Sequence, residues 1–242
     1  MVGTYRIAGL NIEIQSVHER VQEYCEEYRA TGAADLVIKS TQEEIDYQRQ
    51  RCKRHEEEFT RPVDEMSDAY MELMRVNLLI AERMPALGRF LIHGSAIAVD
   101  DECYIFSALS GTGKSTHVAL WRELLGDRAV TVNDDKPIIS VGQDGMATVY
   151  GTPWCGKHRR GKNIAVPLRA ICLLERSEEN RIREMPKSEA VSQLYLHVYR
   201  PSAPKALLET MALVSRMNAR YYTLGCNMDV SAAELAYNTM KG

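Results

Sequence analysis

The first third of the chain alternates between short strand-like and longer helix-like patterns of apolar and polar residues. Alternation with a period of two predicts strands, and apolar residues recurring every three to four positions predict helices. Pro85 ends the last of these helices, and Gly88 leads into a different pattern. We therefore expect a small N-terminal α/β appendage over residues 1–85 and a larger domain over 86–242. The elements expected in the appendage are a strand over 5–14, a helix over 17–28, a strand over 34–39, a very polar helix over 42–58 and an amphipathic helix over 64–84.

Two apolar segments close together in the sequence open the second region. The run over 90–99 is strand-like, residues 100–102 form a turn, and a second strand covers 103–107. Strands joined by about three turn residues form an antiparallel hairpin. A loop of small residues follows the second strand. In most nucleotide-binding folds with such a loop, the preceding strand belongs to a parallel sheet reached through helical crossovers. The hairpin therefore predicts a mixed or antiparallel sheet.

The rest of the chain alternates strands with helices, which is typical of an α/β (or α+β) protein. One apolar strand ends in Asn133-Asp134-Asp135, and residues 151–163 form a densely basic loop. The elements expected here are a helix over 116–125, strands over 129–132, 137–141, 147–150 and 168–174, helices over 188–199 and 204–217, a strand over 220–224 and a helix over 232–240.

Composition narrows the class of protein. Of 242 residues, 45% are hydrophobic and 26% charged, as in ordinary globular domains. A net charge of −3 gives no electrostatic reason to expect a nucleic acid partner. We see no apolar run of about 20 residues, as a membrane span needs, and no secretion signal. The six cysteines show no C-x-x-C pair, so we expect reduced thiols, no zinc site and a cytoplasmic protein.

Residues 105–116, Ile-Phe-Ser-Ala-Leu-Ser-Gly-Thr-Gly-Lys-Ser-Thr, have the chemistry of a triphosphate-binding loop. Glycines let several backbone N–H groups point at one anion, and the following helix N-terminus adds partial positive charge. A lysine then reaches the outer phosphates and a hydroxyl binds Mg²⁺. Ala108 stands where the pattern G-x-x-x-x-G-K-[ST] has its first glycine, and alanine does not adopt positive φ as cheaply. The residues expected to bind ATP are Ser110, Gly111, Thr112, Gly113, Lys114, Ser115 and Thr116.

Asp134 and Asp135 are the candidate catalytic carboxylates, because they end an apolar strand after this loop. Phosphoryl transfer needs a carboxylate to hold the metal and often a second to accept the proton of the acceptor. Asn-Asp-Asp-Lys-Pro is also good turn chemistry, so a plain turn is the alternative interpretation.

Three further candidates have two interpretations each. His93 precedes a glycine on an apolar strand, and is either a core histidine or a neighbour of the phosphates. Lys157 and Arg160 of the basic loop, with Arg159 and Lys162, either clamp the triphosphate or are simply solvated. Trp154 either stacks on adenine or anchors this loop in the core.

Three motifs occur in an order that resembles the kinase domain of HPr kinase/phosphorylase. They are Ile92-His93-Gly94, Leu109-Ser110-Gly111-Thr112-Gly113-Lys114-Ser115 and Asn133-Asp134-Asp135, and the resemblance covers residues 89–174. That family shares a nucleotide-binding core with ATP-dependent phosphoenolpyruvate carboxykinase, whose loop is the more similar to Leu-Ser-Gly-Thr-Gly-Lys. The resemblance implies that fold, with ATP and Mg²⁺ as cofactors.

The resemblance also implies roles. Lys114 contacts the β- and γ-phosphates, Ser115 binds Mg²⁺, Asp134 assists through metal or water, Asp135 takes the proton of the acceptor hydroxyl, and His93 lies near the transferred phosphate. After Asp135 the sequence departs from the bifunctional enzyme. In this region the present chain has the segment Gly-Thr-Pro-Trp (residues 151–154). Similar segments occur in HPr-kinase-like proteins that phosphorylate peptide serines, such as those of lasso-peptide pathways.

The sequence thus favours an ATP- and Mg²⁺-dependent kinase acting on a hydroxyl of a peptide, small protein or small molecule. The alternatives are a carboxykinase-type small-molecule enzyme and a nucleotide-binding regulatory protein without turnover. The appendage has three open roles, which are substrate recognition, a homo-oligomer interface and capping of the core. Neither nucleic acid nor a membrane is an expected partner.

Overall fold

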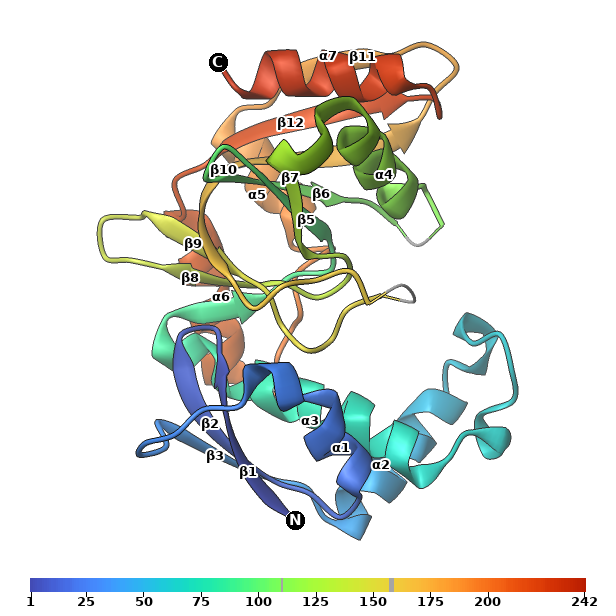
Figure 1. Cartoon of the computed structure of the whole chain (residues 1–242), viewed down its shortest axis with the longest axis vertical. Helices are drawn as coiled ribbons and strands as arrows, with labels where there is room; N and C mark the ends of the chain where they lie inside the picture. Colours follow the sequence, from blue (N-terminus) through green and yellow to red (C-terminus); the bar gives the residue numbers. More distant parts are fainter. Residues whose placement is uncertain (110, 157–158) are drawn as a thin grey trace. The chain divides into compact units, whose positions relative to one another are not determined.

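The computed structural model describes residues 1–109, 111–156 and 159–242 of the chain. It divides them into two compact units, Met1–Arg83 and Met84–Gly242. Figure 1 shows both in the colours of the sequence.

Over its described residues the first unit has a three-stranded sheet, in the order β1-β2-β3. The single strand expected over 5–14 is wrong. Ala8 and Gly9 have φ angles of 51° and 76°, so they form a two-residue turn that makes a hairpin of this segment. The third strand pairs in parallel with the second. The elements are β1 (Val2–Ile7), β2 (Leu10–Gln15), α1 (Glu19–Tyr24), β3 (Leu36–Lys39), α2 (Gln42–Lys53) and α3 (Asp68–Arg83).

The helices of this unit are shorter than expected, because short 3-10 turns follow or precede them. Glu26–Tyr28 continues the first helix as a 3-10 turn, and Glu56–Glu58 follows the second. Val63–Glu65 precedes the third. The polar face of α2 is exposed, whereas Ile45 and Cys52 on its other face are buried in a hydrophobic core of this unit.

Over its described residues the second unit has a nine-stranded mixed sheet in the order β4-β8-β9-β10-β6-β5-β7, with β12 paired to β10 and β11 to β12. The protein is therefore a mixed α/β protein. Its strands are β4 (Arg89–Leu91), β5 (Ser95–Val99), β6 (Glu102–Ser107), β7 (Ala129–Asn133), β8 (Ile138–Val141), β9 (Ala147–Tyr150), β10 (Ala165–Arg176), β11 (Arg181–Glu184) and β12 (Arg220–Cys226).

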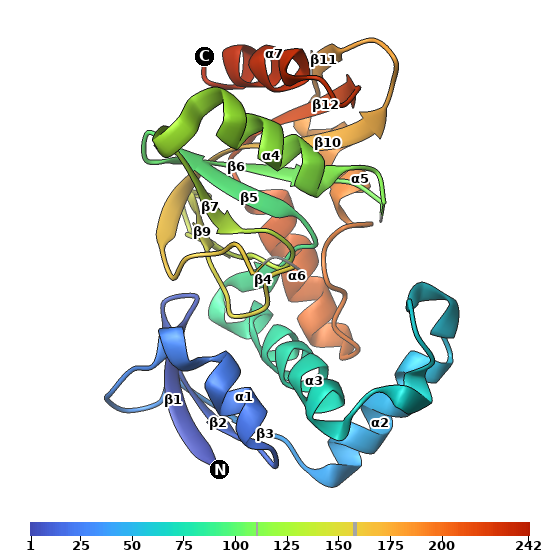
Figure 2. The same cartoon turned by 45° about the vertical axis from the view of Figure 1, so that its right-hand side comes forward.

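Helices cover this sheet on both faces (Figure 1, Figure 2). On β6, Tyr104 and Phe106 belong to the core under α4 (Lys114–Leu125) and α7 (Val230–Met240). Cys103 and Ile105 belong to the opposite core, with α5 (Lys187–Leu194) and α6 (Pro204–Arg216). Because both faces are buried, the central strands are apolar throughout instead of alternating. In the described part of the chain, no helix is long and apolar enough to cross a bilayer.

The continuous strand expected over 90–99 is wrong, because Ile92-His93-Gly94 interrupts it. At this point the chain leaves β8 and joins β6 and β7. His93 N–H donates to the His197 carbonyl (2.8 Å) and Gly94 N–H to the Asp135 carbonyl (3.0 Å). The pairing with residues 197–199 also ends α5 at Leu194, earlier than the expected helix over 188–199. The β5–β6 hairpin is confirmed.

The directions of the strands place four loops at one edge of the sheet. β5 is antiparallel to both β6 and β7, so β6 and β7 run in the same direction. β10 is parallel to β6, and β12 is parallel to β10. The carboxyl ends of β7, β6, β10 and β12 therefore share an edge, which is where ligands bind in many α/β sheets.

Candidate functional site

The glycine-rich loop (residues 108–115) leaves β6 at this edge and runs into α4. Gly111 and Gly113 have φ angles of 76° and 119°, which favour glycine, and a Cβ added at either would meet no atom within 4 Å. Ala108 is buried and has no positive φ, so its position does not require the glycine of the pattern. Ser110 lies outside the described residues.

Lys114 is the first residue of α4 and folds back over the loop. Its Nζ donates to the Ala108 carbonyl at 3.0 Å. Burial lowers the pKa of Lys114 from its ordinary value, and the charge of Asp135 opposes that shift in part. Ser115 and Thr116 are exposed on the first turn of the helix, so their hydroxyls are accessible beside the helix N-terminus.

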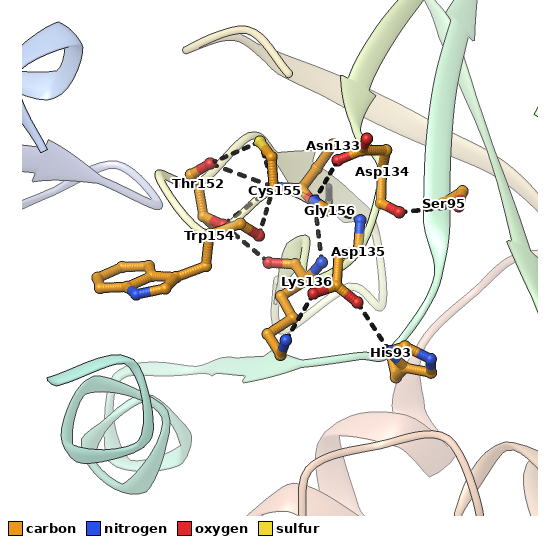
Figure 3. A network of polar contacts seen from close by, with 10 residues as sticks. All are labelled: His93, Ser95, Asn133, Asp134, Asp135, Lys136, Thr152, Trp154, Cys155 and Gly156. Atoms are coloured by element: carbon orange, nitrogen blue, oxygen red, sulfur yellow. Dashed lines mark hydrogen bonds and ion pairs between the residues drawn. The ribbon is translucent and has the colours of Figure 1, made fainter. Parts of the chain in front are cut away.

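Asn133 ends β7 and shapes the acidic segment that follows. This side chain is fully buried. Its Oδ1 accepts hydrogen bonds from the backbone N–H groups of Asp135 (2.9 Å) and Lys136 (2.7 Å). Its Nδ2 donates to the Thr152 carbonyl (3.2 Å) and Oγ1 (3.0 Å), as Figure 3 shows. The turn alternative therefore holds, and the same turn presents both aspartates.

The Asp135 carboxylate lies between the side chains of His93 and Lys136 (Figure 3). His93 Nδ1 is 3.1 Å from its Oδ1, and Lys136 Nζ donates to its Oδ2 at 2.5 Å. Burial would raise the pKa of Asp135, but the hydrogen bond from His93 and the charge of Lys136 outweigh it and hold this pKa well below its usual range. Asp135 is therefore an ionised acceptor at every physiological pH.

Asp134 is fixed from two sides. Its Oδ1 accepts a hydrogen bond from Gly156 N–H at 2.6 Å, and its carbonyl accepts one from Ser95 Oγ at 3.1 Å. Nearby Cys155 donates from Sγ to the Thr152 carbonyl at 3.3 Å. Burial, helped by the charge of Asp134, raises the pKa of Cys155 to about 12, so this thiol stays neutral.

The loop and the acidic segment belong to one charged cluster. Lys114 interacts electrostatically with Asp135. Burial lowers the pKa of His197, and the charges of Lys114 and His93 lower it further. The structure thus brings together four groups from four separate segments of sequence, namely Lys114, Asp135, His93 and His197. His197 has no functional interpretation from its sequence neighbours, because only the pairing of its carbonyl with His93 N–H reveals its position.

The basic loop (residues 151–163) is described only in part. Lys157 lies outside the described residues, and Arg160 is exposed. Trp154 is 6% exposed, as expected for an anchor in the core. The contribution of the segment comes from Thr152 and Gly156, which hold Asn133 and Asp134.

A cavity of about 620 Å³ borders the glycine-rich loop, with Gly111, Thr112 and Gly113 in its lining. Its walls are the first turn of α4 and the segments that follow β10 and β12. The Arg176 guanidinium donates a hydrogen bond from Nη2 to the Gly111 carbonyl, which ties one wall to the loop.

No protein-family model and no curated protein matches the sequence. Among solved structures, the chain is similar to the HPr(Ser) kinase/phosphatase from Coxiella burnetii. The identity is 10% and the TM-score 0.34, over 63% of this chain and 93% of that one. The likeness is a distant one.

Proposed function

We propose that the protein is an ATP- and Mg²⁺-dependent phosphotransferase that moves the γ-phosphate of ATP to a hydroxyl group. One observation carries this proposal. The glycine-rich loop with Lys114 and the turn with Asp135 follow β6 and β7, two parallel strands on either side of β5, at one edge of the sheet, and the two charges interact. A phosphate donor on the loop would therefore lie beside an ionised acceptor.

The donor set at this edge fits Mg²⁺, which prefers oxygen ligands. The exposed Ser115 hydroxyl and the Asp134 carboxylate would hold the ion. When bound, Mg²⁺ neutralises charge on the phosphates. The backbone N–H groups of Gly111 and Gly113 and the Lys114 ammonium would bind the phosphate chain.

Asp135 would orient the attacking hydroxyl by accepting its hydrogen bond. Because its pKa is low, it takes the proton only when the bond to phosphorus is well advanced and the hydroxyl has become acidic. Phosphoryl transfer through a loose transition state needs positioning more than early deprotonation. His93, held by Asp135, would lie next to the transferred group.

For the acceptor we propose a serine of a peptide or small protein, on the basis of the Gly-Thr-Pro-Trp resemblance. A cytoplasmic location and a homo-oligomer remain predictions from the sequence.

Incubation with γ-labelled ATP, Mg²⁺ and cell lysate or candidate serine peptides tests the proposal. Label should appear on a hydroxyl that mass spectrometry identifies, and Lys114→Ala and Asp135→Asn should each abolish its transfer. Labelling by Asp135→Asn that equals labelling by the wild type would contradict the role proposed for Asp135. Tight ATP binding with no transfer to any acceptor would favour the regulatory alternative, and decarboxylation of oxaloacetate with ATP would favour the carboxykinase one.

A further inference from the structure

The cavity beside the glycine-rich loop has the position of a ligand subsite. The first turn of α4 contributes Thr116 and His117 to its wall, and the same turn follows directly on the loop. Cys226 and Met228 contribute from the end of β12. One extended ligand can therefore lie on the loop with one end and in the cavity with the other. The volume of about 620 Å³ is in the usual range for small-molecule sites.

The buried and half-buried side chains that line this cavity carry no fixed charge. His117 is 2% exposed. Its Nε2 accepts a hydrogen bond from Trp121 Nε1 at 3.1 Å, which leaves the proton on Nδ1. That buried Nδ1 has no hydrogen-bond partner among the described residues. Burial raises the pKa of Cys226 and keeps its thiol neutral. A flat ring with acceptor nitrogens suits such surroundings better than a charged group does.

Two charged side chains of opposite sign, Arg176 and Glu178, line the cavity, and both are exposed. Arg176 is bonded to the loop through the Gly111 carbonyl, so this cation lies at the loop end. Glu178 brings a carboxylate to the wall after β10. A ligand with an anionic chain and a neutral ring is favoured with its chain toward Arg176 and the helix N-terminus.

Met228 is 80% exposed at this cavity, although it is a large apolar side chain. Methionine is flexible, and its sulfur makes favourable contacts with aromatic rings. We infer that the cavity binds the nucleoside of a nucleoside triphosphate, and that Met228 packs on the base. This inference rests on the proposed function, because it takes the glycine-rich loop as the site of the phosphates.

Calorimetric titration of the full chain with ATP and with inorganic tripolyphosphate, each with Mg²⁺, tests the inference. Met228→Ala should weaken ATP binding by about three- to tenfold, since that is the size of a sulfur–aromatic contact. Its affinity for tripolyphosphate should be unchanged. The matched control is Met146→Ala, which replaces another methionine that is 62% exposed but does not line the cavity. Cys226→Phe, which fills the cavity, should weaken ATP binding further, again with tripolyphosphate unaffected.

Wild-type protein that binds tripolyphosphate as tightly as ATP would overturn the inference, because the nucleoside would then contribute nothing. Met228→Ala and Cys226→Phe variants that bind ATP like the wild type would overturn it too, and so would equal losses for both ligands. The proposed phosphotransferase would survive these results. Its own failure has a different signature, in which Lys114→Ala binds both ligands as tightly as the wild type.

Discussion

The side chains of His93 and Asp135 are hydrogen-bonded, with Nδ1 of the imidazole 3.1 Å from Oδ1 of the carboxylate. The first residue lies in the link between β4 and β5, and the second follows β7. The Asp135 carbonyl also accepts the N–H of Gly94, next to His93, so backbone and side chains hold the two segments together. The proposed catalytic carboxylate is thereby fixed in position and in charge.

Asp135→Asn should therefore lower kcat by at least about 10²-fold, in the range for loss of a catalytic base. An amide keeps the shape of the side chain but is a weaker acceptor and takes no proton. The dissociation constant for ATP should stay within about threefold, because the loop binds the phosphates. Transfer assays and calorimetry measure the two quantities. Asp127→Asn, at an exposed position, is the matched control. Full activity of Asp135→Asn would rule out the assigned role.

Lys136→Gln should move the acidic limb of the pH profile of kcat/KM to higher pH. Lys136 is one of the two groups that hold the pKa of Asp135 down against burial. In the wild type, Asp135 stays ionised, and its stabilising effect is lost only as the pH falls through its low native pKa. Without Lys136 that pKa rises, so activity should begin to fall at a higher pH.

Profiles from pH 4 to 8 check this shift. Lys205→Gln, which changes a lysine whose side chain is 88% exposed, should leave the limb where the wild type has it. An unchanged limb in Lys136→Gln would show that Asp135 does not control the acid side of the profile.

Local patterns predicted the β5–β6 hairpin, the glycine-rich loop and the strand ending in Asn133, because each depends on a few neighbouring residues. The break at Ile92-His93-Gly94 was not predictable from periodicity, since all three positions lie in one apolar run. It arises from backbone pairing with residues 135, 137 and 197, which only the tertiary structure brings close.

The cavity beside the glycine-rich loop could not be predicted from local sequence patterns either. Its walls depend on β10 and β12 lying parallel to β6, and no local signal indicates which strands pair. β11 was missed because its residues Arg181-Ile182-Arg183-Glu184 are mostly exposed and polar, as on an edge strand. Thr152 and Gly156 were overlooked for a similar reason. The basic residues that follow them attracted the functional interpretation, whereas the contacts to Asn133 and Asp134 come from a hydroxyl and a backbone N–H.

Asn133→Ala should lower the free energy of unfolding by about 2 kcal/mol, the usual cost of leaving buried polar groups unpaired. It should also lower kcat, with little change in the KM for ATP, because the turn that presents Asp135 loses its acceptor. Asn133→Asp keeps the Oδ1 acceptor and loses the donor to Thr152, so it should recover part of kcat. Urea unfolding and steady-state kinetics check these outcomes. Asn238→Ala, at an exposed position, is the control, and a variant Asn133→Ala with wild-type kcat would contradict the positioning role.

Lys114 should give ATP binding and folding stability opposite dependences on alkaline pH. Its ammonium attracts the phosphates, and burial holds its pKa below the ordinary value of about 10.4. As the pH rises through that lowered pKa, ATP affinity should fall, whereas the free energy of unfolding without ATP should rise, because the unfolded chain binds the proton more strongly.

Calorimetry and urea unfolding between pH 7 and 10 measure both trends. Lys114→Arg stays charged over this range, so its ATP affinity should not fall. The difference in stability between the wild type and Lys114→Ala isolates the contribution of this one group from those of tyrosines and cysteines. If ATP affinity changes with pH in the same way in the wild type and in Lys114→Arg, the phosphates are held without the Lys114 charge. ATP affinity that falls while the free energy of unfolding rises with pH requires one buried ammonium, which destabilises the free protein and binds the nucleotide.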